Sequence, residues 1–193
     1  MKAIELPHAK ALVQIVASSP ELMAILRCVR SLGMGSWCVG AGAVRNLVWD
    51  SLHGRSSGIA SDVDVVYFDA ESAPERDAEL EARLRSLMPG VDWEVTNQAH
   101  VHRWFARALQ QEVAPLESLA HGISTWPEFA TCVGVYLAED ESIGVVAPHG
   151  LEDLFEMRVR HNAARASAAE FERRIQAKRF RERWPRLVMG AAG

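Results

Sequence analysis

Two aspartates separated by one residue, Asp62 and Asp64, begin the most β-favouring segment of the sequence, residues 62–68. On a strand, residues two apart point to the same face, so the two carboxylates would lie side by side while Val63 faces the core. Neighbouring carboxylates raise each other's pKa unless a cation lies between them, and hard cations such as Mg²⁺ and Mn²⁺ prefer oxygen ligands. The spacing therefore indicates a platform for a divalent metal. The alternative is a strand that starts in solvent and carries two surface aspartates.

A glycine-containing turn precedes this segment. Residues 36–39 are short, apolar and β-favouring, Gly40 and Gly42 follow, and residues 44–52 can form a helix. Glycine lets backbone N–H groups approach a phosphate closely, and a helix N-terminus adds positive potential. Arg45 suits bidentate phosphate contact. The turn is neither a P-loop nor a complete dinucleotide-binding fingerprint, because no Gly-Lys-Ser/Thr follows and Arg45 stands where the third Gly or Ala belongs.

Together, the turn and the paired carboxylates have the parts that metal-assisted nucleotidyl transfer needs. The turn would hold a triphosphate, and the carboxylates would hold ions that bridge the phosphates and activate the attacking oxygen. Asn97 and Gln98 follow a third predicted strand and could hydrogen-bond a base or ribose, although Asn97 fits equally well as a helix N-cap. The candidate nucleotide-binding residues are Gly40, Gly42, Arg45, Asn46, Ser61, Asn97 and Gln98.

The elements that would position these residues alternate in type, which predicts an α/β (α+β) fold. Helical periodicity covers residues 10–32, with a break where Ser19 and Pro20 provide an N-cap and a first helical residue. The other expected elements are strands at 36–39, 62–68 and 91–96, helices at 74–87 and 98–110, a helix start at 124–128, a hairpin of 132–137 with 142–147, and a largely helical segment at 151–183.

Charge is unevenly distributed along the chain. The 193 residues carry a net charge of −4, yet residues 158–186 hold ten lysines and arginines against three acids. This basic segment could hold phosphates, RNA or the acidic body of the protein. Arg174 and Lys178 are four residues apart and share a helix face, for which we favour exposure to solvent over contact with a triphosphate. We expect a single domain with N-terminal helices (1–35), a catalytic sheet core (36–147) and a basic helical C-terminal region (148–193).

Several classes of protein and site are disfavoured. Three cysteines without a CxxC pair suggest neither a disulfide framework nor a zinc knuckle. His100 and His102 would diverge on the expected helix, so a zinc pair is not expected there. No apolar run approaches the ~20 residues that cross a bilayer, and no signal-peptide pattern is present. A cytoplasmic protein without membrane association is therefore expected.

Two short motifs in this chain resemble those of a known superfamily. Residues 42–46 (Gly-Ala-Val-Arg-Asn) and 62–65 (Asp-Val-Asp-Val) are similar to the Gly-Gly-x-Val-Arg-Asp and Asp-x-Asp motifs of CCA-adding and poly(A) polymerases, within the DNA polymerase β nucleotidyltransferase superfamily. The chain more closely resembles a family of small bacterial nucleotidyltransferase-like proteins of undetermined substrate. That similarity covers residues 37–185 and rests on residues 40–46, 62–64, 93–98, 126–127 and 150–155.

The resemblance implies a small mixed β-sheet flanked by helices, with the metal carboxylates on adjacent strands. It also implies a third carboxylate, for which Glu94 is the first choice and Asp92 the alternative. Asp62, Asp64 and Glu94 would then hold Mg²⁺ or Mn²⁺. The implied reaction moves a nucleoside monophosphate from an NTP to an acceptor, whether protein, RNA or small molecule, that the sequence does not identify.

Departures from the polymerase motif argue against a role as a processive or CCA-adding polymerase. Asn46 stands where the motif has Asp, Ala41 stands where it has Gly, and no classifiable RNA-binding domain follows. Trp126 and Asp153 are expected to have structural roles, with base stacking as the alternative for Trp126. Two other functions stay open: a non-catalytic, antitoxin-like module that binds a nucleotide or a partner, and a metal-dependent phosphohydrolase. Consumption of an NTP with Mg²⁺ or Mn²⁺ would distinguish an enzyme from the binding module.

Overall fold

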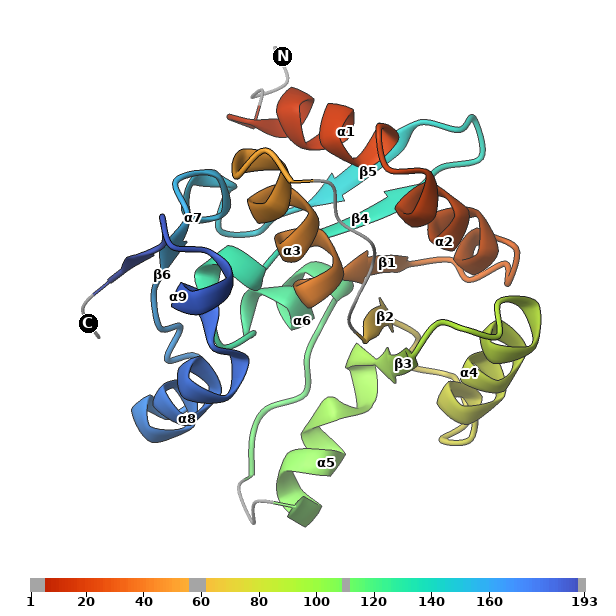
Figure 1. Ribbon diagram of the computed structural model, residues 1–193. Helices are drawn as coiled ribbons and strands as arrows, with labels where there is room; N and C mark the ends of the chain where they lie inside the picture. The colour runs from red at the N-terminus through yellow and green to blue at the C-terminus, as the bar shows by residue number, and fades with distance from the viewer. Residues whose placement is uncertain (1–5, 56–61, 109–111, 191–193) are drawn as a thin grey trace, which may run out of the picture.

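A mixed β-sheet of five strands forms the centre of the described part of the molecule (Figure 1). The computed structural model describes residues 6–55, 62–108 and 112–190. The strand order is β3-β2-β1-β4-β5, in which β2 and β3 run parallel and the other neighbours run antiparallel. The strands are β1 (Trp37–Gly40), β2 (Val63–Tyr67), β3 (Trp93–Asn97), β4 (Gly134–Leu137) and β5 (Ile143–Val146). This architecture confirms the expected α/β fold with a small mixed sheet.

The first three helices of the chain, α1 to α3, cover one face of the sheet (Figure 1). The main hydrophobic core lies between these helices and the sheet. Val39, Val63 and Val65 point to this face and are fully buried, because alternate residues of a strand share a face. Helix α4 packs against β3 and connects it to β2 as a crossover. The helices concerned are α1 (Ala9–Ala17), α2 (Pro20–Arg30), α3 (Ala41–Leu52) and α4 (Arg76–Leu87).

The opposite face of the sheet has a smaller cover. Cys38 and Val66 point to this side, where they pack with Cys132 and with helix α6 (Leu119–Ser124). Because α6 has only six residues, it shields a limited part of the face. Positions beside Val66 on β2 and β3 are therefore left for a cleft rather than for the core.

The break between α1 and α2 follows the local signals in the sequence. Ser19 accepts a hydrogen bond from the backbone N–H of Leu22 at 3.2 Å, and Pro20 is the first residue of α2. Such a cap satisfies one of the N–H groups that a helix start leaves without an intrahelical partner. The predicted N-cap is confirmed.

The segment after residue 151 is less helical than its periodicity predicts. Strand β6 (Arg158–Val159) runs parallel to β7 (Val188–Met189), and no helix covers residues 156–167 of the described chain. Val159 is fully buried there and Arg160 binds Asp153, so tertiary contacts replace the helical pattern. The helices that do form are α7 (Glu152–Phe155), α8 (Ala168–Lys178) and α9 (Phe180–Arg183).

The predicted helix start at residues 124–128 is also wrong. Helix α6 ends at Ser124, and only a 3₁₀ turn, Phe129–Thr131, follows. The carbonyls of Ser124 and Trp126 instead accept hydrogen bonds from the Asn162 amide at 2.7 and 2.8 Å. A distant side chain therefore satisfies backbone groups that the sequence pattern assigned to a helix.

Within the described residues, no single helix is long and apolar enough to cross a membrane. Helices α1 and α2 pass that test only as a pair, and a bend of 93° separates them. Their apolar residues pack into the core of the molecule.

Candidate functional site

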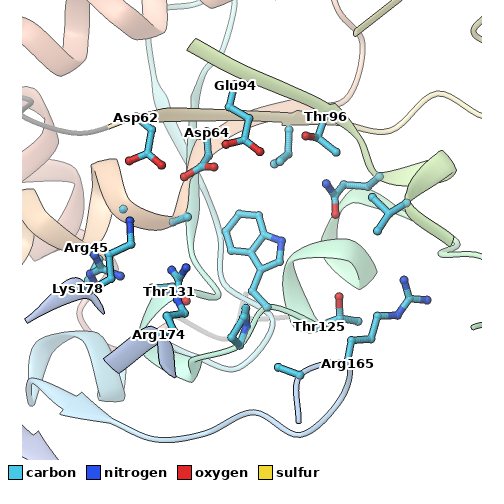
Figure 2. A pocket seen from close by; sticks show the side chains of 18 of the residues that line it. Arg45, Asp62, Asp64, Glu94, Thr96, Thr125, Thr131, Arg165, Arg174 and Lys178 are labelled. Carbon is cyan, nitrogen blue, oxygen red and sulfur yellow. The ribbon is translucent and has the colours of Figure 1, made fainter. Parts of the chain in front are cut away.

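Three carboxylates from two neighbouring strands line a cleft of about 370 Å³ (Figure 2). Asp62 immediately precedes β2, Asp64 lies within it, and Glu94 lies within β3. The parallel register pairs Asp64 directly with Glu94, so both side chains occupy the face that α6 leaves open. Asp92, the alternative to Glu94, is exposed and does not line the cleft.

The electrostatics of these carboxylates suit a hard cation. Burial, Glu94 and Asp62 raise the pKa of the Asp64 carboxyl from its usual value to about 6, against the opposing effect of Arg174 and Lys178. Closely placed carboxylates of this kind gain stability when a cation neutralises them. Among the described residues no group of three or more Asp, Glu, His or Cys side chains is placed to hold a metal ion by itself. Mg²⁺ usually binds to one or two carboxylates together with substrate phosphates and water, so an open set of oxygen ligands fits that ion.

The raised pKa of Asp64 predicts a pH-dependent cost to the metal-free fold. Above about pH 4 the unfolded chain loses this proton, whereas the folded state retains it until about pH 6, so stability falls as the pH rises between the two values. Asp64→Asn should therefore be more stable than the wild type by about 2–3 kcal/mol at pH 7.5, with the difference fading near pH 4. Urea denaturation in EDTA across this range checks the prediction. A difference that does not change with pH would contradict it.

The glycine-containing segment at the start of α3 packs closely against neighbouring residues on one side and lines the cleft on the other. A side-chain carbon at Gly40 would lie 2.6 Å from the Trp126 ring and 3.1 Å from the Val133 carbonyl oxygen, so glycine is required there by close packing. Ala41 adopts a left-handed backbone with φ of 49°, and its N–H donates to that same carbonyl at 3.3 Å. Ala41 and Gly42 line the cleft, whereas Gly40 does not line it and instead packs against Trp126.

Arg45 is buried inside the protein beneath the cleft, with 3 % of its surface exposed. Its guanidinium lies 4.5 Å from the ring centre of Phe180 and 5.2 Å from that of Trp49. It donates to the Asn46 side-chain oxygen at 2.9 Å, and its Nη1 lies 3.5 Å from a Glu128 oxygen. Burial lowers the pKa of Arg45 to about 10, with Glu128 opposing the shift, so the group stays charged at neutral pH. Phosphate contact by Arg45 and Asn46 stays a prediction.

Glu128 is a residue that the sequence did not single out for this site. It is 1 % exposed and accepts hydrogen bonds from Arg174 Nε at 2.5 Å and from Thr131 Oγ1 at 3.1 Å. Only an indirect signal pointed to such a residue, because a buried arginine such as Arg45 needs a carboxylate as its counter-charge. Glu128 is separated from Arg45 by 83 positions, and no local pattern links the two.

Helix α8 contributes cations to the cleft. The side chains of Arg174 and Lys178 line it opposite the carboxylates, which corrects the expectation of a solvent-facing surface (Figure 2). Both residues also lower the pKa of Asp64, as positive charges facing a carboxylate should. The packing of α8 and α9 against α3, through Phe180 and Trp49, brings this face to the site.

The remaining nucleotide-binding candidates separate into three cases. Asn97 is buried, and its amide bonds to backbone groups of Asp69 and Ala99 and to the Ser72 hydroxyl, which matches the cap alternative. Gln98 lines the cleft. Ser61 lies outside the described residues.

Comparisons with known proteins agree with this geometry. A nucleotidyltransferase family model matches residues 27–189. A solved NMR structure, described as revealing a CCA-adding enzyme head domain, is 29 % identical, with a TM-score of 0.76 over 94 % of this chain and 95 % of that one. No curated protein sequence matches the chain.

Two full CCA-adding enzymes share the fold. One, solved with CTP, is 15 % identical, with a TM-score of 0.56 over 94 % of this chain and 42 % of that one. The Thermotoga maritima enzyme, solved with tRNA, is 13 % identical, with a TM-score of 0.55 over 93 % and 42 %. This chain thus spans less than half the length of those enzymes. The family match covers most of its residues, and the chain therefore belongs to this nucleotidyltransferase family.

Proposed function

We propose that the protein transfers a nucleoside monophosphate from an NTP to a hydroxyl or phosphate oxygen of an acceptor. The acceptor oxygen attacks the α-phosphorus, the bond from that phosphorus to the bridging oxygen breaks, and pyrophosphate leaves. A proton from an acceptor hydroxyl passes to a carboxylate of the site. We place this reaction in the cytoplasm, in keeping with the free thiols of Cys28, Cys38 and Cys132.

One observation carries the proposal: acidic and basic side chains face each other across a single cleft. Asp62, Asp64 and Glu94 form one wall, while Arg174 and Lys178 reach it from α8. The cations suit the β- and γ-phosphates, because they can neutralise charge on the leaving pyrophosphate. The carboxylates suit the reacting end, because they can orient the acceptor and take its proton.

Asp62, Asp64 and Glu94 would hold the divalent metal, Mg²⁺ or Mn²⁺. When bound, such an ion supplies positive charge that polarises the phosphoryl oxygens. The raised pKa of Asp64 supports this assignment, because burial and like charge disfavour its ionised form until a cation is present.

Metal-dependent NTP binding tests the proposal directly. Isothermal titration with each of the four NTPs should show binding in Mg²⁺ or Mn²⁺ that EDTA removes. The double variant Asp62→Asn and Asp64→Asn should lose this binding, whereas Asp92→Asn, an exposed carboxylate outside the cleft, should bind as the wild type does. Undiminished binding by the double variant would refute the site assignment.

The acceptor is the open part of the proposal. CCA-adding relatives have been solved with CTP and with tRNA, and this chain corresponds to under half their length. Protein, RNA and small-molecule acceptors all remain candidates for it. Incubation with radiolabelled NTP and separated cell fractions of each class would identify the acceptor by transfer of label, and labelled product free of acceptor would indicate hydrolysis instead.

A further inference from the structure

The cleft has two chemically different ends. Lys178 and Arg45 lie on the side of Asp62, whereas Thr96 and Arg165 lie at the other end (Figure 2). A polyphosphate binds most favourably at the Lys178 end, where Arg45 and Arg174 add positive charge and Arg165 does not reach. The carboxylates mark the place of the α-phosphate. The far end is then the place for a less charged part of the ligand.

Gln98 presents an unused amide to this far end. It is 4 % exposed and lines the cleft, yet its amide makes no hydrogen bond to any other described residue. Neither amide atom is fully shielded from solvent, so the donor and the acceptor open into the cleft, where water or a ligand satisfies them. The side chain is also held in place: a carbon added at Gly122 of α6 would lie 2.5 Å from the Gln98 side-chain oxygen and 2.8 Å from its Cγ.

Trp126 supplies an aromatic ring to the same cleft. The indole is half-buried, lines the cleft and lies against the backbone of Gly40. Its backbone carbonyl accepts a hydrogen bond from the Asn162 amide, so contacts hold both the backbone and the ring of Trp126 in place. The arginine at this end is also engaged, because Arg165 donates to the Ala114 carbonyl at 2.5 Å and lies over the Phe105 ring.

The spacing from the carboxylates matches the reach of a nucleoside. Gln98 follows Glu94 by four residues, a separation on the order of 10 Å at the rise of an extended chain. Thr96 lies between them and lines the same cleft. A nucleoside extends over this range from its 5′-phosphate to the edge of its base.

We propose that Trp126 and Gln98 form the subsite for the base of the nucleoside triphosphate. The base lies against the Trp126 ring, and the Gln98 amide pairs with its hydrogen-bonding edge. Stacking on an aromatic ring tolerates every base, whereas an amide with one donor side and one acceptor side distinguishes between them. Trp126 therefore supplies affinity and Gln98 supplies selectivity. This inference rests on the proposed nucleotidyl transfer.

Isothermal titration of the four NTPs and of inorganic tripolyphosphate, all with Mg²⁺, tests the subsite. The wild type should prefer one NTP over the weakest by at least tenfold. Gln98→Ala should remove that preference, Gly122→Ala should weaken it by displacing the amide, and Trp126→Ala should lower the affinity for all four NTPs. Tripolyphosphate binding should stay unchanged in every variant, and Gln176→Ala, an exposed glutamine of α8, should match the wild type.

Three results would overturn the base subsite. They are equal wild-type affinity for the four NTPs, an unchanged ranking in Gln98→Ala, and a parallel loss of tripolyphosphate binding. Each leaves metal-dependent NTP binding, and with it the proposed function, in place. Circular dichroism and thermal unfolding of each variant confirm that it is folded, and Trp126→Phe serves if the alanine variant does not fold.

Discussion

Replacing Glu94 with glutamine should slow nucleotidyl transfer by about 10²–10⁴-fold, the usual contribution of a group that takes the proton of the acceptor. Asp62 and Asp64 remain to hold the metal in this variant, so the affinity for NTP should change much less. Glu94 lies in register with Asp64 and lines both the cleft and an adjoining hollow under helix α5 (Val101–Ala108). That hollow is walled by His100 and by Trp104, whose side chain is 57 % exposed. An acceptor entering through this hollow would reach Glu94 from beneath α5.

Pyrophosphate release, measured with the acceptor fraction that supports wild-type turnover, gives the rate of Glu94→Gln. Titration with NTP gives its affinity. Asp92→Asn is the matched control, because Asp92 lies two residues away on the same segment but outside the cleft. If Asp92→Asn slowed the reaction and Glu94→Gln did not, the choice of third carboxylate would be wrong.

Replacing Glu128 with glutamine should destabilise the fold by about 3–5 kcal/mol, the cost of leaving a buried charge without its partner. Arg45 would be left among the rings of Phe180, Trp49 and Trp184 without the carboxylate that opposes the effect of burial on its pKa. Arg174 would lose the acceptor that orients it toward the cleft. We therefore expect weaker NTP binding as well as lower stability.

Guanidinium denaturation at pH 7 measures the loss in Glu128→Gln. The matched control is Glu141→Gln, which removes an exposed carboxylate paired with Arg27 and Arg30 on the surface. Exposed ion pairs contribute little to stability, so this control should unfold close to the wild type. Similar unfolding curves for the two variants would show that the buried network is not needed for the fold.

Local patterns in the sequence determined much of the framework. The alternation around Asp62 and Asp64 specified a strand with both carboxylates on one face, and Ser19 with Pro20 specified the start of α2. Gly40 and Gly42 correctly marked the change from strand to helix, although α3 begins at Ala41, between them. Such features depend on backbone geometry within a few residues, so the residue types and their spacing are sufficient to predict them.

Tertiary structure decided which distant residues meet at the cleft. The parallel register of β2 and β3 placed Glu94 beside Asp64, a relation that depends on strand pairing across a helical crossover. Burial of Arg45 required a counter-charge, and the fold supplied Glu128 from a segment that the sequence assigned to a helix. Arg174 is oriented toward the cleft because it also donates a hydrogen bond to Glu128.

The amphipathic pattern of α8 specified an apolar and a basic face but not what the basic face would meet. Packing of Phe180 and Trp184 against Trp49 turned that face, with Lys178, toward the carboxylates. Helical periodicity records which residues avoid water, whereas the partner of a charged face depends on how whole elements dock. The sequence therefore determined that Asp62 and Asp64 share one face of a strand. Only the folded chain determined which side chains join them, Glu94 on the acidic wall and Arg174 and Lys178 on the basic wall.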